Sequence, residues 1–218
     1  MADPITLTLV GTVVLTEGIK FLYGQAGELL KRWRERSDAA QTGTVEAIES
    51  PLIASPEIFE GALSPLKADV NRIRELESGL RKLRNDLADY AQGIDTIDPS
   101  NSALISTTDA LRQQLEGIYG QRITFKGERE RPPSGTPLVV GEAEVRRLTG
   151  LAGGVIAGTV TEGEVRGKIK VEQVESAGVG GGVIVDSVTG GKIQGKMNAE
   201  QVDRGGTAAG VKVDKIGR

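Results

Sequence analysis

The chain has 218 residues, a formal net charge of −3, one Trp, three Tyr and three Phe, and it contains neither histidine nor cysteine. The missing residue types exclude disulfides, Cys/His zinc sites and any acid–base or relay mechanism built on imidazole. We therefore expect a protein that is not an enzyme and has no cofactor, and the mixed charges argue against nucleic acid as a partner.

The two halves of the chain differ in composition. No aromatic residue follows Phe125, and most glycines lie beyond residue 150. This change predicts a helical domain followed by a β domain. The start of the chain shows neither a basic leader nor a small-residue cleavage site, so we expect a cytoplasmic protein.

A helix is predicted at the N-terminus, where Asp3 and Pro4 form a typical helix start. Residues 5–16 carry no charge, and a helix that is apolar nearly all round belongs either in the centre of a bundle or in lipid. The charge-free stretch is shorter than the ~20 residues that cross a bilayer, and both interpretations stay open. The residues that would enter lipid are Ile5, Leu7, Leu9, Val10, Val13, Val14, Leu15, Ile19, Phe21 and Leu22.

The same helix is expected to end in a basic cluster around the single tryptophan. Cations stabilise the C-terminus of a helix, and beside an interfacial tryptophan they also suit anionic headgroups. The alternative is a core helix with a solvated basic end. The candidate membrane-surface residues are Lys31, Arg32, Trp33, Arg34 and Arg36.

Two further helices complete a predicted bundle over residues 1–125. The second opens at Ser55-Pro56-Glu57 and carries an apolar seam from Leu63 to Ile94. The third has its buried edge between Leu104 and Ile118. Residues 126–137, KGERERPPSGTP, contain no apolar side chain and are expected to form a linker that joins neither core.

A repeat dominates the remainder of the chain. Residues 156–183 align with 184–211 without a gap and with 12 identities, and a weaker 14-residue period runs inside it. Such a period is typical of stacked β architecture, in which one unit buries its apolar face on the next. The pattern predicts a glycine-rich β-solenoid over residues 138–218 with two strand–turn rungs per 28-residue coil. A 14-residue coil and a β-meander remain as alternatives.

The alternation of residues indicates which side chains face inward. Val and Ile are expected inside and Glu, Lys and Gln outside, with Glu164 on the surface and the recurring glycines at the corners of the coil. The expected assembly core is Val160, Val165, Ile169, Val171, Val174, Val183, Val185, Val188, Ile193, Met197, Val202, Val211, Val213 and Ile216. The predicted fold class is thus α+β in two domains.

This layout resembles the HeLo, Bell and MLKL group of cell-death effectors. At the level of residues, the likeness lies in the N-terminal segment, MADPITLTLVGTVV leading to FLYGQAGELLKRW. The resemblance implies a helical bundle that permeabilises membranes and a C-terminal amyloid-like segment that controls assembly. Asparagine ladders, which fungal prion-type repeats contain, are missing here. The phrases G-x-[VI]-x-G-x-[VIM]-x-[VA] also resemble bactofilins, which are β-helical filament proteins.

We therefore expect a bacterial, non-enzymatic effector whose N-terminal helix inserts into lipid and whose repeats form or template a homopolymer. Its partners would be copies of itself, membrane lipids and a protein with a similar repeat that templates assembly. It would move from the cytoplasm to the inner face of the membrane on activation. The alternative is a structural filament or scaffold protein with a helical anchoring domain.

Overall fold

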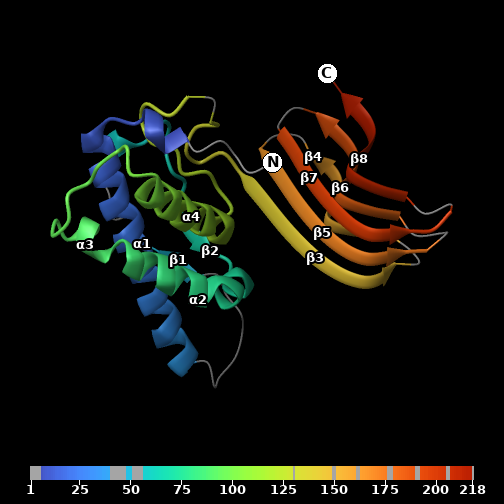
Figure 1. The fold of residues 1–218 in the computed structure, drawn as a ribbon, viewed down its shortest axis with the longest axis horizontal. Coiled ribbons are helices and arrows are strands. Elements are labelled where there is room, and N and C mark those ends of the chain that lie inside the picture. Colours follow the sequence, from blue (N-terminus) through green and yellow to red (C-terminus); the bar gives the residue numbers. More distant parts are fainter. Residues whose placement is uncertain are drawn as a thin grey trace. The chain divides into compact units, whose positions relative to one another are not determined.

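The computed structural model describes residues 6–39, 48–50, 56–129, 131–148, 151–160, 163–175, 179–189, 192–204 and 207–217. The chain divides into a helical unit that ends at Thr136 and a strand unit that begins at Pro137 (Figure 1). Its mixture of helix and strand confirms the expected α+β class.

The described residues of the helical unit form three helices of four or more turns and several short elements. In chain order these are η1 (Thr6–Leu9), α1 (Thr12–Ala39), β1 (Ile48–Ser50), η2 (Pro56–Ile58), β2 (Leu66–Ala68), α2 (Val70–Asp86), α3 (Ala88–Ala91) and α4 (Ser102–Tyr119). Strands β1 and β2 form a small antiparallel ladder.

The second long helix begins at Val70, and the expected start at Ser55-Pro56-Glu57 is therefore wrong. Only a short 3-10 turn forms at that earlier signal. The carboxylate of Asp69 accepts hydrogen bonds from the backbone of Asn71 and Arg72, which fixes the helix start. The third predicted helix corresponds to α4, which is capped by the side chain of Asn101 and ends at a left-handed glycine, Gly120.

The core of the helical unit lies where α1, α2 and α4 meet. Apolar side chains from all three helices are fully buried there, and two residues that follow α4 join them. Phe125 stacks on Phe59, which in turn meets Phe21 edge to face. The central side chains are Leu15, Ile19, Leu22, Leu29, Ile73, Leu80, Leu111, Leu115, Ile123 and Phe125.

Residues 126–137 were expected to form a free linker, but most of this segment is bound to the helical unit. The backbone N–H of Lys126 donates to Ile58, and that of Gly135 donates to Arg122. The side chains of Glu128 and Ser134 are buried. This polar segment packs against the bundle because its charged groups find buried partners of opposite charge, which composition by itself does not reveal.

The described strands of the second unit form two parallel sheets of three strands each. Its strands are β3 (Leu138–Leu148), β4 (Leu151–Val160), β5 (Glu164–Val174), β6 (Val179–Thr189), β7 (Lys192–Val202) and β8 (Thr207–Gly217). Consecutive strands alternate between the sheets, whose orders are β3-β5-β7 and β4-β6-β8 (Figure 1). Ile169 pairs with Met197, and Val155 pairs with Val183. Stacking thus follows the 28-residue period, whereas a meander or a 14-residue coil would pair consecutive strands.

Glycines mark the line along which the two sheets touch. A Cβ on Gly141, Gly167 or Gly195 would overlap a backbone carbonyl oxygen of the opposite sheet, because only hydrogen separates the two backbones. The six glycines of this contact, which we call the glycine seam, are Gly141, Gly154, Gly167, Gly182, Gly195 and Gly210. They lie inside strands, so the expected position at corners is wrong for them. Gly163, with φ of 99°, does lie between strands.

The glycine seam divides the interior of the strand unit into two small apolar clusters. One contains Ile169, Val171 and Val174, which follow the seam in β5. The other contains Val165, which precedes the seam, and Val183 and Val185, which follow it in β6. Each cluster therefore combines the first part of strands in one sheet with the second part of strands in the other.

Replacing Gly167 by alanine should unfold the strand unit. The added methyl group meets the carbonyl of Gly182, which belongs to a strand and cannot rotate away, so we expect a loss above the ~3 kcal/mol typical of overpacking. In Gly180→Ala the nearest atom is the flexible end of Met197, and a smaller loss should result. Thermal unfolding followed by circular dichroism in the β region measures both. Equal effects of the two substitutions would contradict the close backbone contact.

Candidate functional site

The apolar N-terminal residues lie mainly in the interior of the helical unit. Leu7, Val10, Leu15, Ile19, Phe21 and Leu22 are buried. Val13 is the exception, with 77% of its surface exposed, and Val14 is half-buried. Ile5 and the side chain of Leu9 lie outside the described residues. This segment is apolar on several sides because α1 packs between α2, α4 and the loops that precede them.

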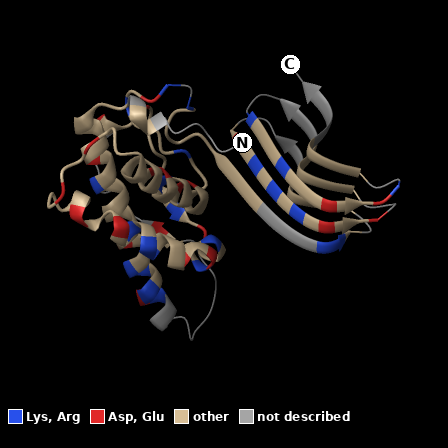
Figure 2. Cartoon of the chain, viewed as in Figure 1, with Lys and Arg blue, Asp and Glu red and all other residues tan. Residues whose placement is uncertain are grey.

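The basic residues gather toward the C-terminal end of α1 (Figure 2). Arg32 donates through Nε to Glu28 at 2.6 Å and through Nη1 to the carbonyl of Glu49 at 2.9 Å. Lys31 and Arg34 are exposed. The structure therefore assembles most of the predicted cluster on one helix end but uses Arg32 for local pairing.

Trp33 belongs to the packing of the bundle. Its indole N–H donates to the carboxylate of Glu77 at 2.9 Å, and Arg81 binds the same carboxylate at 2.6 Å. The guanidinium of Arg74 lies 6.0 Å from the indole centre. The hydrogen bonds from Arg81 and Trp33 hold the pKa of Glu77 below its usual range. This tryptophan therefore ties α1 to α2 in the structure described.

The predicted assembly residues fall into an inner and an outer set. Buried members come from the inner strands β5 and β6, and Ile193 and Met197 of β7 pack against them. Val202 in β7 and Val211 in β8 are exposed, at 44% and 39% of their surface. The side chains of Val160, Val188, Val213 and Ile216 lie outside the described residues. The inner set is Val165, Ile169, Val171, Val174, Val183 and Val185.

Glu164 corrects a sequence expectation. Its carboxylate is 1% exposed and accepts a hydrogen bond from Nε of Arg166 at 3.0 Å. The expectation of a surface carboxylate is therefore wrong. Its backbone N–H also donates to the carbonyl of Pro137, so this residue ties the start of β5 to the residue that precedes β3.

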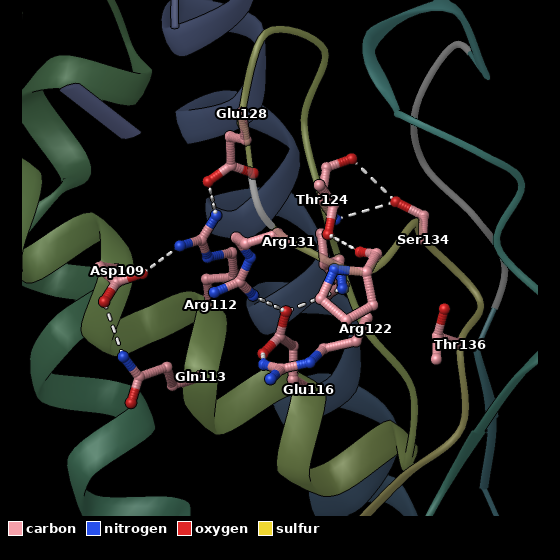
Figure 3. Close-up of polar contacts among 12 residues, drawn as sticks. Asp109, Arg112, Gln113, Glu116, Arg122, Thr124, Glu128, Arg131, Ser134 and Thr136 are labelled. Atoms are coloured by element: carbon pink, nitrogen blue, oxygen red, sulfur yellow. Dashed lines mark hydrogen bonds and ion pairs between the residues drawn. The ribbon is translucent and has the colours of Figure 1, made fainter. Parts of the chain in front are cut away.

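Sequence reasoning did not find the ionic cluster buried between α4 and the segment that follows it (Figure 3). Arg112 on α4 is fully buried and donates to Glu128 at 2.5 Å and to Asp109. Glu128 also accepts from the backbone N–H of Phe125 at 2.7 Å. Burial lowers the pKa of Arg112, but the carboxylates of Glu128, Asp109 and Glu116 raise it by more, and the net direction is upward.

The other half of this ionic cluster is centred on Glu116 of α4. Its carboxylate accepts from Arg122 at 2.7 Å and from Arg131 at 2.5 Å, and from the backbone N–H of Ile123 at 2.8 Å. Three buried arginines therefore face three buried carboxylates: Arg112, Arg122, Arg131, Asp109, Glu116 and Glu128. The i, i+3 and i, i+4 spacing of Asp109, Arg112 and Glu116 was the available signal, although such a pattern usually indicates a solvated face.

The described part of the chain contains neither a group of three acidic side chains suited to a metal ion nor a helix that is long and apolar enough to cross a bilayer. Comparisons with protein-family models, with curated proteins and with solved structures found no match.

Replacing Arg112 by methionine should destabilise the helical unit by about 3 to 5 kcal/mol, because it leaves the buried carboxylates of Asp109 and Glu128 without their cation. Lys20→Met removes a cation from an exposed pair with Glu17 and should cost less than about 1 kcal/mol. Urea unfolding of both variants, followed by helical circular dichroism, makes the comparison. Equal stabilities would show that the ionic cluster does not hold the segment on α4.

Proposed function

We propose that this protein assembles with copies of itself through the open edges of its strand unit, and that assembly activates the helical unit as a membrane-permeabilising effector. In this proposal the strand unit is a β-solenoid with two strands per 28-residue coil, and further coils come from neighbouring molecules. The observation that carries the proposal is that each of the edge strands β3, β4, β7 and β8 has an exposed apolar side chain.

The exposed apolar side chains of the strand unit occupy both ends of the stack. Val139 in β3 and Leu151 in β4 have 52% and 56% of their surface exposed at one end, and Val202 and Val211 are exposed at the other. Every position that is buried in β5 is more exposed at its pairing partner in β7. Among the described strands, none pairs with the outer sides of these four, and parallel edges of this kind are templates for a further chain. An edge residue becomes buried when another coil is added.

The register supports a direct continuation from one molecule to the next. Val139 pairs with Val165, which pairs with Ile193, so one further step brings Ile193 beside Val139 of the next copy. The glycine seam also lacks one backbone contact at the end of the stack. Gly182 contacts β5 and β7 of the opposite sheet, whereas Gly210 contacts β7 alone, and the β3 of a second copy would supply the missing contact.

Charge gives this stacking a direction. One row of paired positions contains Glu142, Lys168 and Lys196. Glu142 belongs to the edge strand β3 and Lys196 to the opposite edge strand β7. Basic residues recur along β5 and β7 (Figure 2). Within one molecule Lys196 pairs in register with another lysine, Lys168, but a head-to-tail contact brings the position of Lys196 beside that of Glu142 in the next copy, and opposite charges at neighbouring positions are favourable. A head-to-tail contact repeats without closing and forms a filament.

Charge reversal at either edge should prevent assembly, and mixing the two variants should restore it. Lys196→Glu brings glutamate to Glu142 of the next copy, and Glu142→Lys brings lysine to Lys196, so each variant alone repels itself. In a mixture the two variants can alternate, so that every contact between unlike copies pairs opposite charges. Sedimentation velocity of the full chain should show polymers for the wild type and for the mixture, and a reduction of roughly five-fold or more in the assembled fraction for each variant.

Lys82→Glu provides the control, because this exposed lysine lies on α2 in the helical unit and should leave assembly unchanged. A wild-type chain that stays monomeric at high concentration while keeping its β spectrum would contradict the proposal. Polymers that neither edge variant affects would require a different contact surface.

The membrane part of the proposal is supported by the apolar N-terminal segment and the basic end of α1. Because most of that segment is buried in the bundle, the described state is a latent one, and insertion requires that the segment leave the core. Polymerisation concentrates many helical units on one filament. The further partners in this proposal are membrane lipids and a protein with a similar repeat that seeds the filament. The site of action would be the inner face of the cell membrane.

A structural filament or scaffold is the second candidate, and the closed packing of the helical unit favours it. In that case α1 stays in the core and the helical units decorate the filament or attach it to a surface. The two functions share the same assembly and differ only in whether assembled protein breaches a membrane.

Val13→Arg separates the two functions, because Val13 is exposed and its substitution leaves the bundle core intact. A charge at bilayer depth costs about 2.5 to 3.5 kcal/mol. If the segment inserts, dye leakage from anionic liposomes caused by assembled wild-type protein should fall strongly in this variant. Ile94→Arg changes an exposed apolar residue far from the segment in sequence and should leave leakage unchanged. Wild-type filaments that cause no leakage would establish the scaffold function.

A further inference from the structure

A cleft of about 440 Å³ lies between α1 and α2. Its size falls in the range of sites that bind small molecules. Its lining contains one large apolar side chain, Leu30, whereas most of its other groups are charged or polar. The residues around it are Gly24, Gly27, Glu28, Leu30, Lys31 and Arg34 of α1, and Arg81, Arg84 and Asn85 of α2.

Arg84 is held in position at the base of this cleft. Its guanidinium lies over the ring of Tyr23, 4.1 Å from the ring centre. A Cβ at Gly27 would lie only 3.0 Å from its Nε, so the absence of a side chain on Gly27 gives Arg84 room to lie against α1. The Nε atom is buried and has no hydrogen-bond partner within the described part of the chain. Arg84 as a whole is half-buried, so an arginine that is fixed against α1 keeps exposed surface with which to bind an acceptor in the cleft.

The cationic charge of the cleft is only partly balanced by neighbouring carboxylates. Arg81 is paired with Glu77, and Glu28 is paired with Arg32. Among the described residues, no ion pair involves the remaining three cations, which are Lys31, Arg34 and Arg84. Two of these residues come from α1 and one comes from α2, so both walls of the cleft contribute a cation.

We propose that this cleft binds a phosphate group that carries more than one negative charge, with Arg84 as the anchoring ligand and with Arg34 and Lys31 as its partners. Phosphate oxygens accept bidentate hydrogen bonds from arginine, and a dianion suits three unpaired cations better than a single carboxylate does. The polar lining excludes an apolar ligand. This site is independent of the assembly proposed above, and its ligand would bridge α1 and α2 and stabilise the closed helical unit.

The probe is inorganic pyrophosphate, titrated into the full chain at constant ionic strength. Saturable binding should appear by calorimetry and as a rise in the unfolding temperature of the helical unit. Arg84→Gln and Arg34→Gln should each weaken binding roughly ten-fold or more, because each removes a charge-assisted hydrogen bond. Lys82→Gln removes the same charge from an exposed position of α2 outside the cleft and should bind like the wild type.

Arg34 is exposed, so its variant keeps the test valid even if Arg84→Gln destabilises the bundle. A second arm uses vesicles that contain phosphatidic acid, with phosphatidylserine vesicles of equal charge as reference. If the protein binds phosphatidic acid vesicles but not pyrophosphate, and Arg34→Gln abolishes this binding, the ligand is a lipid phosphate. If it binds pyrophosphate and Arg34→Gln abolishes that binding, the ligand is a free phosphate. Equal weakening by Lys82→Gln, or no saturable binding in either arm, would overturn the proposal.

Discussion

The strand unit depends on one constraint, which is direct contact between the backbones of its two sheets. At the glycine seam no side chain separates the sheets, and even a methyl group would collide with a carbonyl oxygen. Apolar side chains therefore fill two small clusters instead of one continuous layer. Each cluster has few fully buried members, and burial is best in the inner strands β5 and β6.

This geometry explains why the unit favours extension. Hydrophobic stabilisation is roughly proportional to the apolar area removed from water, and in a stack each added coil converts two edge strands into inner ones. A unit with three strands per sheet has as many edge strands as a much longer stack, so a large share of its apolar surface stays exposed. Repetition at 28 residues supplies a matching surface at both ends, which is the condition for end-to-end growth.

In the helical unit, buried ion pairs hold the polar segment that follows α4 against that helix. The ionic cluster adds to the apolar packing of Ile123 and Phe125, which follow α4, and its three arginines balance its three carboxylates. Burying such groups costs desolvation energy, and good geometry with further hydrogen bonds is needed to repay it. Glu116 and Glu128 each meet that need by accepting a backbone N–H as well as arginine. The cation-rich cleft between α1 and α2 differs from this cluster, because no ion pair within the described part of the chain involves its Lys31, Arg34 or Arg84.

The sequence alone determined the division into helices and strands, the 28-residue spacing of paired strands and the buried edge of α4. These follow from short-range patterns: periodicity of apolar residues, the Asn101 and Gly120 caps, and identity between repeats. Only the tertiary structure decided where the glycines lie, that Glu128 and Ser134 are buried, and that α1 is enclosed on several sides. Each of these features depends on which segments, distant in the sequence, pack together. A charged residue can be buried only where the fold supplies an opposite charge, and an apolar residue is buried only where the fold places other apolar groups against it.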